Sequence, residues 1–195
     1  MISAPNPISH VALLVPSVTK AAAVLDGHRF PIGVPEKWDG EGTLEIYVGD
    51  KTQRSLLLLM EPIKTGAYSR AMEKRGPGLH HVAIDVLDLE IFIERISGSG
   101  WLLHPKSLHT IKKMGTAYLA RPGTPLLVEV QQREEIPSKQ PFITQIKIPL
   151  SQRDVEMLNA IGVNEFENSQ STDSWIQFGE TRVTFEALGI VKKVL

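Results

Sequence analysis

The apolar and polar positions of this chain divide it into short alternating runs and segments with helical spacing. Residues 8–15 (ISHVALLV) and residues 79–86 (LHHVAIDV) alternate between branched apolar side chains and other residues, as half-buried strands do. Residues 88–100 carry apolar side chains at helical spacing and reach two glycines, which predicts a helix that stops there. Residues 115–130 hold two further apolar runs around a Pro-Gly pair, which predicts two strands joined by a turn. The pattern predicts an α+β fold.

The first part of the chain is repeated further along at a constant offset. Superimposing ISHVALLV on LHHVAIDV places His10 on His81, an offset of 71 residues. The later apolar run around Leu58 matches the run around Glu129 at the same offset. Either match alone could arise by chance, but two matches with one spacing indicate a duplicated unit.

Each copy reads as one strand, one helix and then more strands, which predicts two paired βαβββ modules. Their bounds are about residues 8–63 and 78–132, and together they should form a curled mixed sheet around a cleft. Residues 133–141 are polar and contain proline, which is typical of a linker. Residues 142–195 repeat the unit in a shortened form, as a third βαβββ-like half-module.

This third unit has no partner module within the chain. An unpaired unit would expose an apolar sheet edge or face, so we expect residues 142–195 to pair with a second copy in a homodimer. Gln145 stands in this unit where the histidines stand, and Glu186 where Glu129 stands. Two copies of each could meet at a second, symmetric site or form a hydrogen-bonded structural cluster.

Composition excludes several classes of protein. The 195 residues carry a formal net charge of −1, which provides no electrostatic basis for binding nucleic acid or an anionic membrane surface. The longest apolar run, LLLLM, is far shorter than the roughly 20 residues that span a bilayer. No cysteine is present and the N-terminus lacks the pattern of a signal peptide, so we expect a cytoplasmic protein without disulfides.

The candidate chemistry lies on one face of the predicted strands. Side chains alternate along a strand, so His10 and His81 should point away from the branched side chains that pack on the helices. Glu129 lies among valines, where an unpaired carboxylate would cost on the order of several kcal/mol. Together the three residues suit a divalent ion such as Co, Mn, Ni, Zn or Fe, although hydrogen-bonded structural histidines are the alternative. The same alternation predicts that His80 faces the opposite side.

These features resemble the vicinal oxygen chelate superfamily, which includes glyoxalase I, extradiol dioxygenases and methylmalonyl-CoA epimerase. The chain is most similar to the epimerases, through the segments ISHVALLVPSVTKA, LLLLMEPI, EKRGPGLHHVA and LLVEVQQ. The resemblance covers about residues 8–132 and implies that His10, His81 and Glu129 are metal ligands. The fourth ligand of the family falls on Leu58, which cannot coordinate a metal.

The resemblance also implies an activity. The enzyme would move a proton through a metal-stabilised enolate of a small carbonyl or acyl-CoA substrate, with Glu129 at the catalytic centre. The family's proton-transfer glutamate falls on Gly40, so the adjacent Glu41 is the expected base, with Glu36 and Asp39 as alternatives in the same loop.

Other polar residues have weaker assignments. Three basic residues on a predicted helix surface could contact the CoA moiety: Arg70, Lys74 and Arg75. His104 and His109 are expected in a loop that borders the cleft, either in contact with substrate or simply on the surface.

Two alternative functions remain at this stage. Three ligands with open coordination positions also resemble a non-haem iron dioxygenase of the same superfamily. The same cavity could instead serve a non-catalytic protein that binds small ligands.

Overall fold

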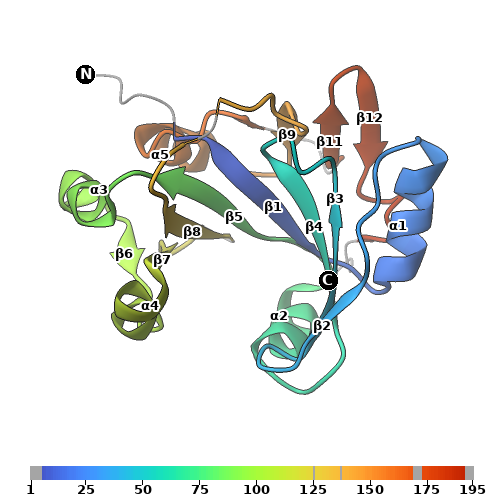
Figure 1. The fold of residues 1–195 in the computed structure, drawn as a ribbon, viewed down its shortest axis with the longest axis horizontal. Helices are drawn as coiled ribbons and strands as arrows, with labels where there is room; N and C mark the ends of the chain where they lie inside the picture. Colours follow the sequence, from blue (N-terminus) through green and yellow to red (C-terminus); the bar gives the residue numbers. More distant parts are fainter. Residues whose placement is uncertain (1–5, 125, 137, 169–172, 192–195) are drawn as a thin grey trace.

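The computed structural model describes residues 6–124, 126–136, 138–168 and 173–191, and arranges them in an eight-stranded sheet, a four-stranded sheet and five helices (Figure 1). The first part of the chain forms β1 (Ile8–Leu14), α1 (Val18–Gly27), β2 (Glu36–Trp38), β3 (Thr43–Val48), β4 (Leu56–Pro62) and α2 (Ala67–Arg75). The second forms β5 (Gly78–Val86), α3 (Leu89–Ile96), β6 (Leu102–Leu103), α4 (Ser107–Met114), β7 (Thr116–Ala120) and β8 (Leu127–Gln132). The third forms β9 (Gln145–Lys147), α5 (Gln152–Ala160), β10 (Phe166–Glu167), β11 (Trp175–Phe178) and β12 (Thr181–Thr184).

The large sheet consists of two halves with the same internal order. Its strands run β2-β3-β4-β1-β5-β8-β7-β6, so that each half reads outward from its own first strand. β1 and β5 pair antiparallel at the centre, whereas β1 pairs parallel with β4 and β5 pairs parallel with β8. The α+β fold with paired modules and a mixed sheet is therefore confirmed.

Local sequence accounts for where the helices begin. Ser17 caps α1 and Asp88 caps α3, each accepting a hydrogen bond from a backbone N–H of the first turn. Ser151 does the same for α5 in the third unit. None of the helices in the described part of the chain combines the length and hydropathy needed to cross a membrane.

The second half contains a helix that the pattern did not predict. His109 lies in α4 rather than in a loop, while His104 does lie in the connection that precedes it. α4 is amphipathic over only two turns and ends at Gly115, whose φ of 60° is left-handed. A helix this short gives too few apolar positions for its period to be recognised.

The two faces of the large sheet have different coverings. On the outer face, branched side chains of β1, β4, β5 and β8 pack under α1, α3 and the third unit in one core. On the inner face, Ala12, Leu14, Leu58 and Met60 pack against α2 through Tyr68, Ala71 and Met72. α2 therefore covers one end of the face that carries His10.

The third unit packs onto the paired modules of its own chain. Phe142 and Phe178 contact the Phe30 ring at centroid distances of 5.3 and 4.9 Å, and the Trp101 indole N–H donates to the Met157 carbonyl at 3.1 Å. Apolar side chains of β9, α5 and β11 belong to the same core as those of β1. The premise that this unit exposes an apolar face was wrong, because the outer face of the large sheet covers it. The homodimer itself stays a prediction, as does the cytoplasmic location.

Candidate metal centre

His10, His81 and Glu129 converge on the inner face of the large sheet. His10 Nε2 and His81 Nε2 lie 3.1 Å apart, and His81 Nε2 lies 3.6 Å from Glu129 Oε2. One ligand atom from each of the three residues falls within 4.8 Å of the other two. Residues separated by 71 and 48 positions in sequence thus meet at one point, as the repeat predicts.

Burial keeps both imidazoles neutral. His10 and His81 each expose 6% of their surface. Burial, with a smaller effect of the Arg133 charge, lowers the pKa of His10 to about 4. Burial, followed by the charges of His10 and His80, lowers the pKa of His81 well below 6.5. Neutral imidazoles have the free nitrogen lone pairs that a metal ion requires.

The carboxylate is oriented from one side. Gln131 Nε2 donates to Glu129 Oε1 at 2.8 Å, and the Arg133 guanidinium in turn donates to the Gln131 side-chain oxygen. Arg133 Nε also donates to Asp85 Oδ1 at 2.8 Å. Burial raises the pKa of Glu129, while the hydrogen bond from Gln131 opposes that rise. The bond leaves Oε2 directed at the histidines.

The three side chains fit a metal ion. Ligand atoms about 2.0–2.2 Å from one ion at tetrahedral angles lie roughly 3.4 Å apart, and the two measured separations of 3.1 and 3.6 Å bracket that value. Two neutral histidines and one carboxylate suit zinc and the divalent ions from manganese to nickel.

His80 contradicts the prediction that it faces the other side. The pairing of β5 with β1 passes from Ala12↔His81 directly to Leu13↔Leu79, so His80 is an extra residue in a β-bulge. Its Nδ1 lies 2.9 Å from His81 Nδ1, and its ring packs against Tyr68 of α2. Simple strand alternation failed here because the bulge turns two consecutive side chains toward the same face.

The contact with His80 allows a tautomer of His81 that suits a metal ion. When His81 donates from Nδ1 to His80, its Nε2 carries the lone pair that faces His10 and Glu129. A nitrogen lone pair and a carboxylate oxygen would then point at each other, an arrangement that a cation stabilises. All three buried histidines, His10, His80 and His81, belong to this centre, whereas His28, His104 and His109 are exposed.

The duplication extends across the sheet as two matched rows of residues. One row, read through the strand pairing, is Tyr47, Leu58, Ala12, His81 and Leu127. The other row is Tyr118, Glu129, Ala83, His10 and Leu56. The two rows differ chemically at one pair, Leu58 and Glu129, which explains why the centre has one carboxylate.

The tyrosines of these rows were missed from sequence. Tyr47 and Tyr118 are related by the same 71-residue offset as the ligands, so extending the repeat to the third strand of each module would have found them. The Tyr47 and His10 rings meet edge to face with centroids 5.7 Å apart, and Lys106 Nζ lies 4.7 Å from the centre of the Tyr118 ring. Burial, with repulsion from Glu45 and Glu129, raises the pKa of Tyr47 to about 12.

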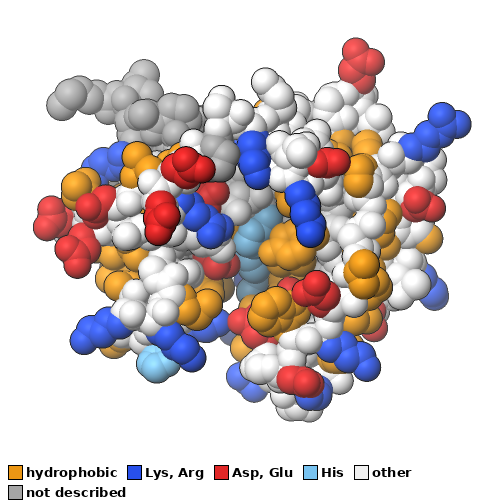
Figure 2. Space-filling model, in the orientation of Figure 1, with side chains coloured by type: hydrophobic (Ala, Val, Ile, Leu, Met, Phe, Trp, Pro, Cys, Tyr) orange, Lys and Arg blue, Asp and Glu red, His pale blue; other side chains and the backbone are white. Residues whose placement is uncertain are grey.

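Glu41 lies at the mouth of the centre, in the turn between β2 and β3. Its Oε2 accepts a hydrogen bond from the Tyr68 hydroxyl at 2.6 Å, and its Oε1 lies 3.3 Å from Lys106 Nζ of the second module. Figure 2 shows histidine side chains at the bottom of a hollow between the two halves of the molecule. The other predicted carboxylates face solvent: Asp39 pairs with Lys64, and Glu36 lies in β2 rather than in a loop.

Glu45 is a second carboxylate that the sequence analysis missed. It lies two residues from Tyr47 on the same face of β3 and exposes 8% of its surface. Thr43 Oγ1 donates to Glu45 Oε1 at 2.7 Å. Burial is the main cause of its raised pKa, and the charges of Glu41 and Glu129 add to the effect.

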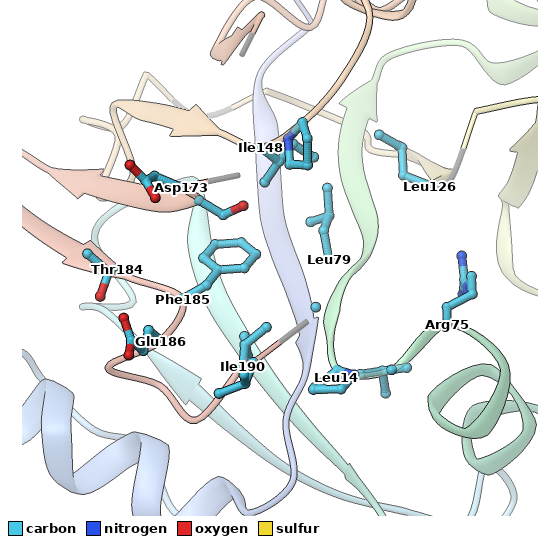
Figure 3. A pocket seen from close by; sticks show the side chains of 16 residues that line it. Leu14, Arg75, Leu79, Leu126, Ile148, Asp173, Thr184, Phe185, Glu186 and Ile190 are labelled. Carbon is cyan, nitrogen blue, oxygen red and sulfur yellow. The ribbon is translucent and has the colours of Figure 1, made fainter. Parts of the chain in front are cut away.

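The residues proposed for a second site do not meet within one chain. Gln145 donates to Glu167 on the neighbouring strand β10. Glu186 lines a separate cavity of about 700 Å³, between the third unit and the edge of the sheet where β1 ends and β5 begins (Figure 3). Arg75, one of the predicted CoA contacts, lines the same cavity, whereas Arg70 and Lys74 are exposed on α2.

The paired βαβββ modules form a vicinal oxygen chelate type of fold, and the three candidate ligands lie on the inner face of its large sheet. No protein-family model matches the sequence, and no curated protein matches it. Solved structures do match: a hypothetical protein from Bacillus halodurans has a TM-score of 0.56 at 21% identity, over 69% of this chain and 99% of its own. A Streptomyces coelicolor methylmalonyl-CoA epimerase variant in complex with 2-nitronate-propionyl-CoA has a TM-score of 0.51 at 18% identity, over 69% and 100%. The Mycobacterium tuberculosis epimerase has a TM-score of 0.50 at 19% identity, over 68% and 93%. At these identities the similarity establishes the fold.

Proposed function

We propose that this protein is a metal-dependent enzyme that transfers a proton at the carbon next to the carbonyl of a small acyl substrate, of which an acyl-CoA is the leading candidate. The observation that carries the proposal is the convergence of His10, His81 and Glu129 within 4.8 Å on the inner face of the large sheet. The epimerase fold of the structural neighbours supports the same class of reaction.

One set of residues would hold the metal ion, and a different set would transfer the proton. His10, His81 and Glu129 would hold a divalent cation, and Gln131 fixes the carboxylate. A cation bound there supplies positive charge that stabilises the negative charge of an enolate.

Two carboxylates are candidates for the proton transfer. Glu41 is the one implied by the family resemblance, and it stands at the mouth with Tyr68 and Lys106 as partners. Glu45 lies deeper, and its raised pKa suits a group that must both accept and return a proton near neutral pH. Glu41→Gln and Glu45→Gln, compared in one assay, assign the role.

A basic cavity near the ligand strands suits the anionic part of an acyl-CoA. It measures about 340 Å³ and lies where β1 begins and β5 ends. Four basic side chains line it, Lys51, Arg54, Arg133 and Lys139, against two acidic ones, Asp85 and Glu135. We propose this cavity rather than the outer surface of α2 as the contact for phosphate groups.

The test combines metal binding with proton exchange. Purified protein should bind one equivalent of Zn²⁺ or Co²⁺ in calorimetry, and His81→Ala should abolish binding while His28→Ala, at an exposed histidine, should not. The loaded protein should then exchange the α-proton of methylmalonyl-CoA in D₂O, followed by NMR. Absence of metal binding, or exchange that a chelator does not affect, would refute the proposal.

A second candidate function follows from Leu58. With a leucine at the fourth position, the centre has the 2-His-1-carboxylate composition of non-haem iron oxygenases. Protein purified from cells with bound iron, and oxygen consumption on adding a catechol, would favour this alternative. Selective binding of small ligands without turnover would instead favour a binding protein.

A further inference from the structure

We propose that Tyr47 and Tyr118 form a matched pair of hydrogen-bond donors that hold two oxygen atoms of the substrate from opposite sides of the metal centre. The inference rests on the proposed function, because it needs a ligand with oxygen atoms between the two phenols. Under this proposal each module contributes one tyrosine that contacts the substrate directly, in addition to the residues that it contributes to the metal centre.

The strand register places the two phenols symmetrically. Tyr47 is paired with Leu58 and Tyr118 with Glu129, so each tyrosine flanks the residue at the closing-strand ligand position. Tyr47 is two strands and two residues from His10, a distance of about 12 Å along a flat sheet. Its ring centroid nevertheless lies only 5.7 Å from that of His10, so the two side chains lean toward each other.

The phenol oxygens are available to a ligand. In the described part of the chain, the Tyr68 hydroxyl has a partner in Glu41, whereas neither the Tyr47 nor the Tyr118 hydroxyl has one. Tyr47 keeps 42% of its surface exposed although it lies on the ligand face of the sheet. The Lys106 ammonium group against the face of the Tyr118 ring limits where that ring can move.

The chemistry favours a ligand with two oxygen atoms that share negative charge, such as an enolate beside a carboxylate or a dicarboxylate. Hydrogen bonds to charged acceptors are stronger than those between neutral groups. Neutral phenols can donate such bonds without adding positive charge to a centre that already attracts a cation. A substrate with one uncharged oxygen would gain much less.

Oxalate provides a direct probe, since it presents oxygen atoms at both ends and undergoes no proton transfer. Its affinity for the Zn²⁺-loaded full-length protein can be measured by calorimetry for the parent, Tyr47→Phe, Tyr118→Phe and the double variant. Each single change should weaken oxalate binding about tenfold and the double change about a hundredfold, with Zn²⁺ affinity unchanged within twofold. His28→Ala, at an exposed residue that follows α1, should leave oxalate binding unchanged.

A spectroscopic readout separates a donor from a structural residue. The sequence has three tyrosines, and all of them lie at this hollow, so ring-labelled tyrosine NMR gives signals from the site alone. Adding oxalate to the loaded protein should shift the signals that are lost in Tyr47→Phe and Tyr118→Phe.

The outcomes are distinguishable from failure of the proposed function. Loss of Zn²⁺ binding in the parent protein would remove both proposals. Normal Zn²⁺ binding with undiminished oxalate affinity in the double variant would overturn only the donor pair. A visible charge-transfer band in the iron(III)-loaded protein that disappears in Tyr47→Phe would also overturn it, by showing that the phenolate is itself a ligand.

Discussion

Replacing Leu58 with glutamate would make the two residue rows of the sheet chemically equivalent. Leu58 is 3% exposed and occupies the place in its row that Glu129 occupies in the other. A carboxylate there would approach His10 as Glu129 approaches His81, whose facing atoms are 3.6 Å apart. The variant should therefore bind metal through four side chains instead of three.

The added carboxylate changes both the affinity for metal and the stability of the metal-free protein. Four-ligand zinc sites bind with about 10–16 kcal/mol, so one added ligand contributes on the order of 3 kcal/mol, roughly a hundredfold in Kd. Without metal, a second buried carboxylate costs on the order of 3 kcal/mol. For a chain of 195 residues that cost lowers Tm by about 6–12 °C. Leu58→Glu should thus be less stable than the parent when metal-free and bind Zn²⁺ more tightly.

The assay is a pair of thermal unfolding curves with and without Zn²⁺, together with a competition titration against a chelator. Met60→Glu is the matched control, because Met60 lies on the same face of β4, is 1% exposed and pairs with Glu45 rather than with a ligand row. It should lose stability without gaining affinity. Equal behaviour of the two variants, or weaker Zn²⁺ binding by Leu58→Glu, would refute the assignment of the fourth position.

Further predictions address the ligand support, the histidines and the third unit. Gln131→Leu removes the donor to Glu129 and should weaken Zn²⁺ binding about 10–100-fold by calorimetry, and unchanged affinity would exclude a positioning role. The pKa of His10 is about 4 when folded against 6.5 when unfolded, so the unfolded chain binds more protons between these values and stability falls as the pH drops through that window. Urea unfolding of the metal-free protein at pH 7 and pH 4.5 should show a loss to which His10 contributes about 2 kcal/mol. His10→Gln should remove that share and keep the part that belongs to His80 and His81, and profiles that run parallel in the parent and the variant would contradict the prediction. Ile146→Ala, at a fully buried side chain of β9, should cost about 2–5 kcal/mol in one calorimetric transition, whereas two transitions would show that the third unit does not share the core.

The repeated strands could be predicted because their information is local and periodic. His10, His81 and Glu129 were predicted as candidate ligands from one constant offset. Because matching strands of the two modules pair at the centre of the sheet, residues at that offset lie close together whatever the loops do. The same reasoning applied to the third strand of each module would have found Tyr47 and Tyr118.

Other features depend on contacts that no local pattern reports. The bulge at His80 depends on the register of β5 against β1, a partner about 70 residues away in sequence. The position of the third unit depends on the outer face of the large sheet, whose coverage by only two helices was not evident from the sequence. Helix α4 was missed because two helical turns carry too weak a period.

The single mismatch between the two residue rows has a consequence for how a molecule enters the hollow. If the two walls were related by an exact two-fold axis, a molecule and the same molecule rotated by 180° would meet identical surroundings. The two binding orientations would then have equal energy. With an apolar wall at Leu58 and an anionic wall at Glu129, the two orientations differ in energy. Within the two matched rows, this one pair of residues makes the two orientations of a bound molecule unequal.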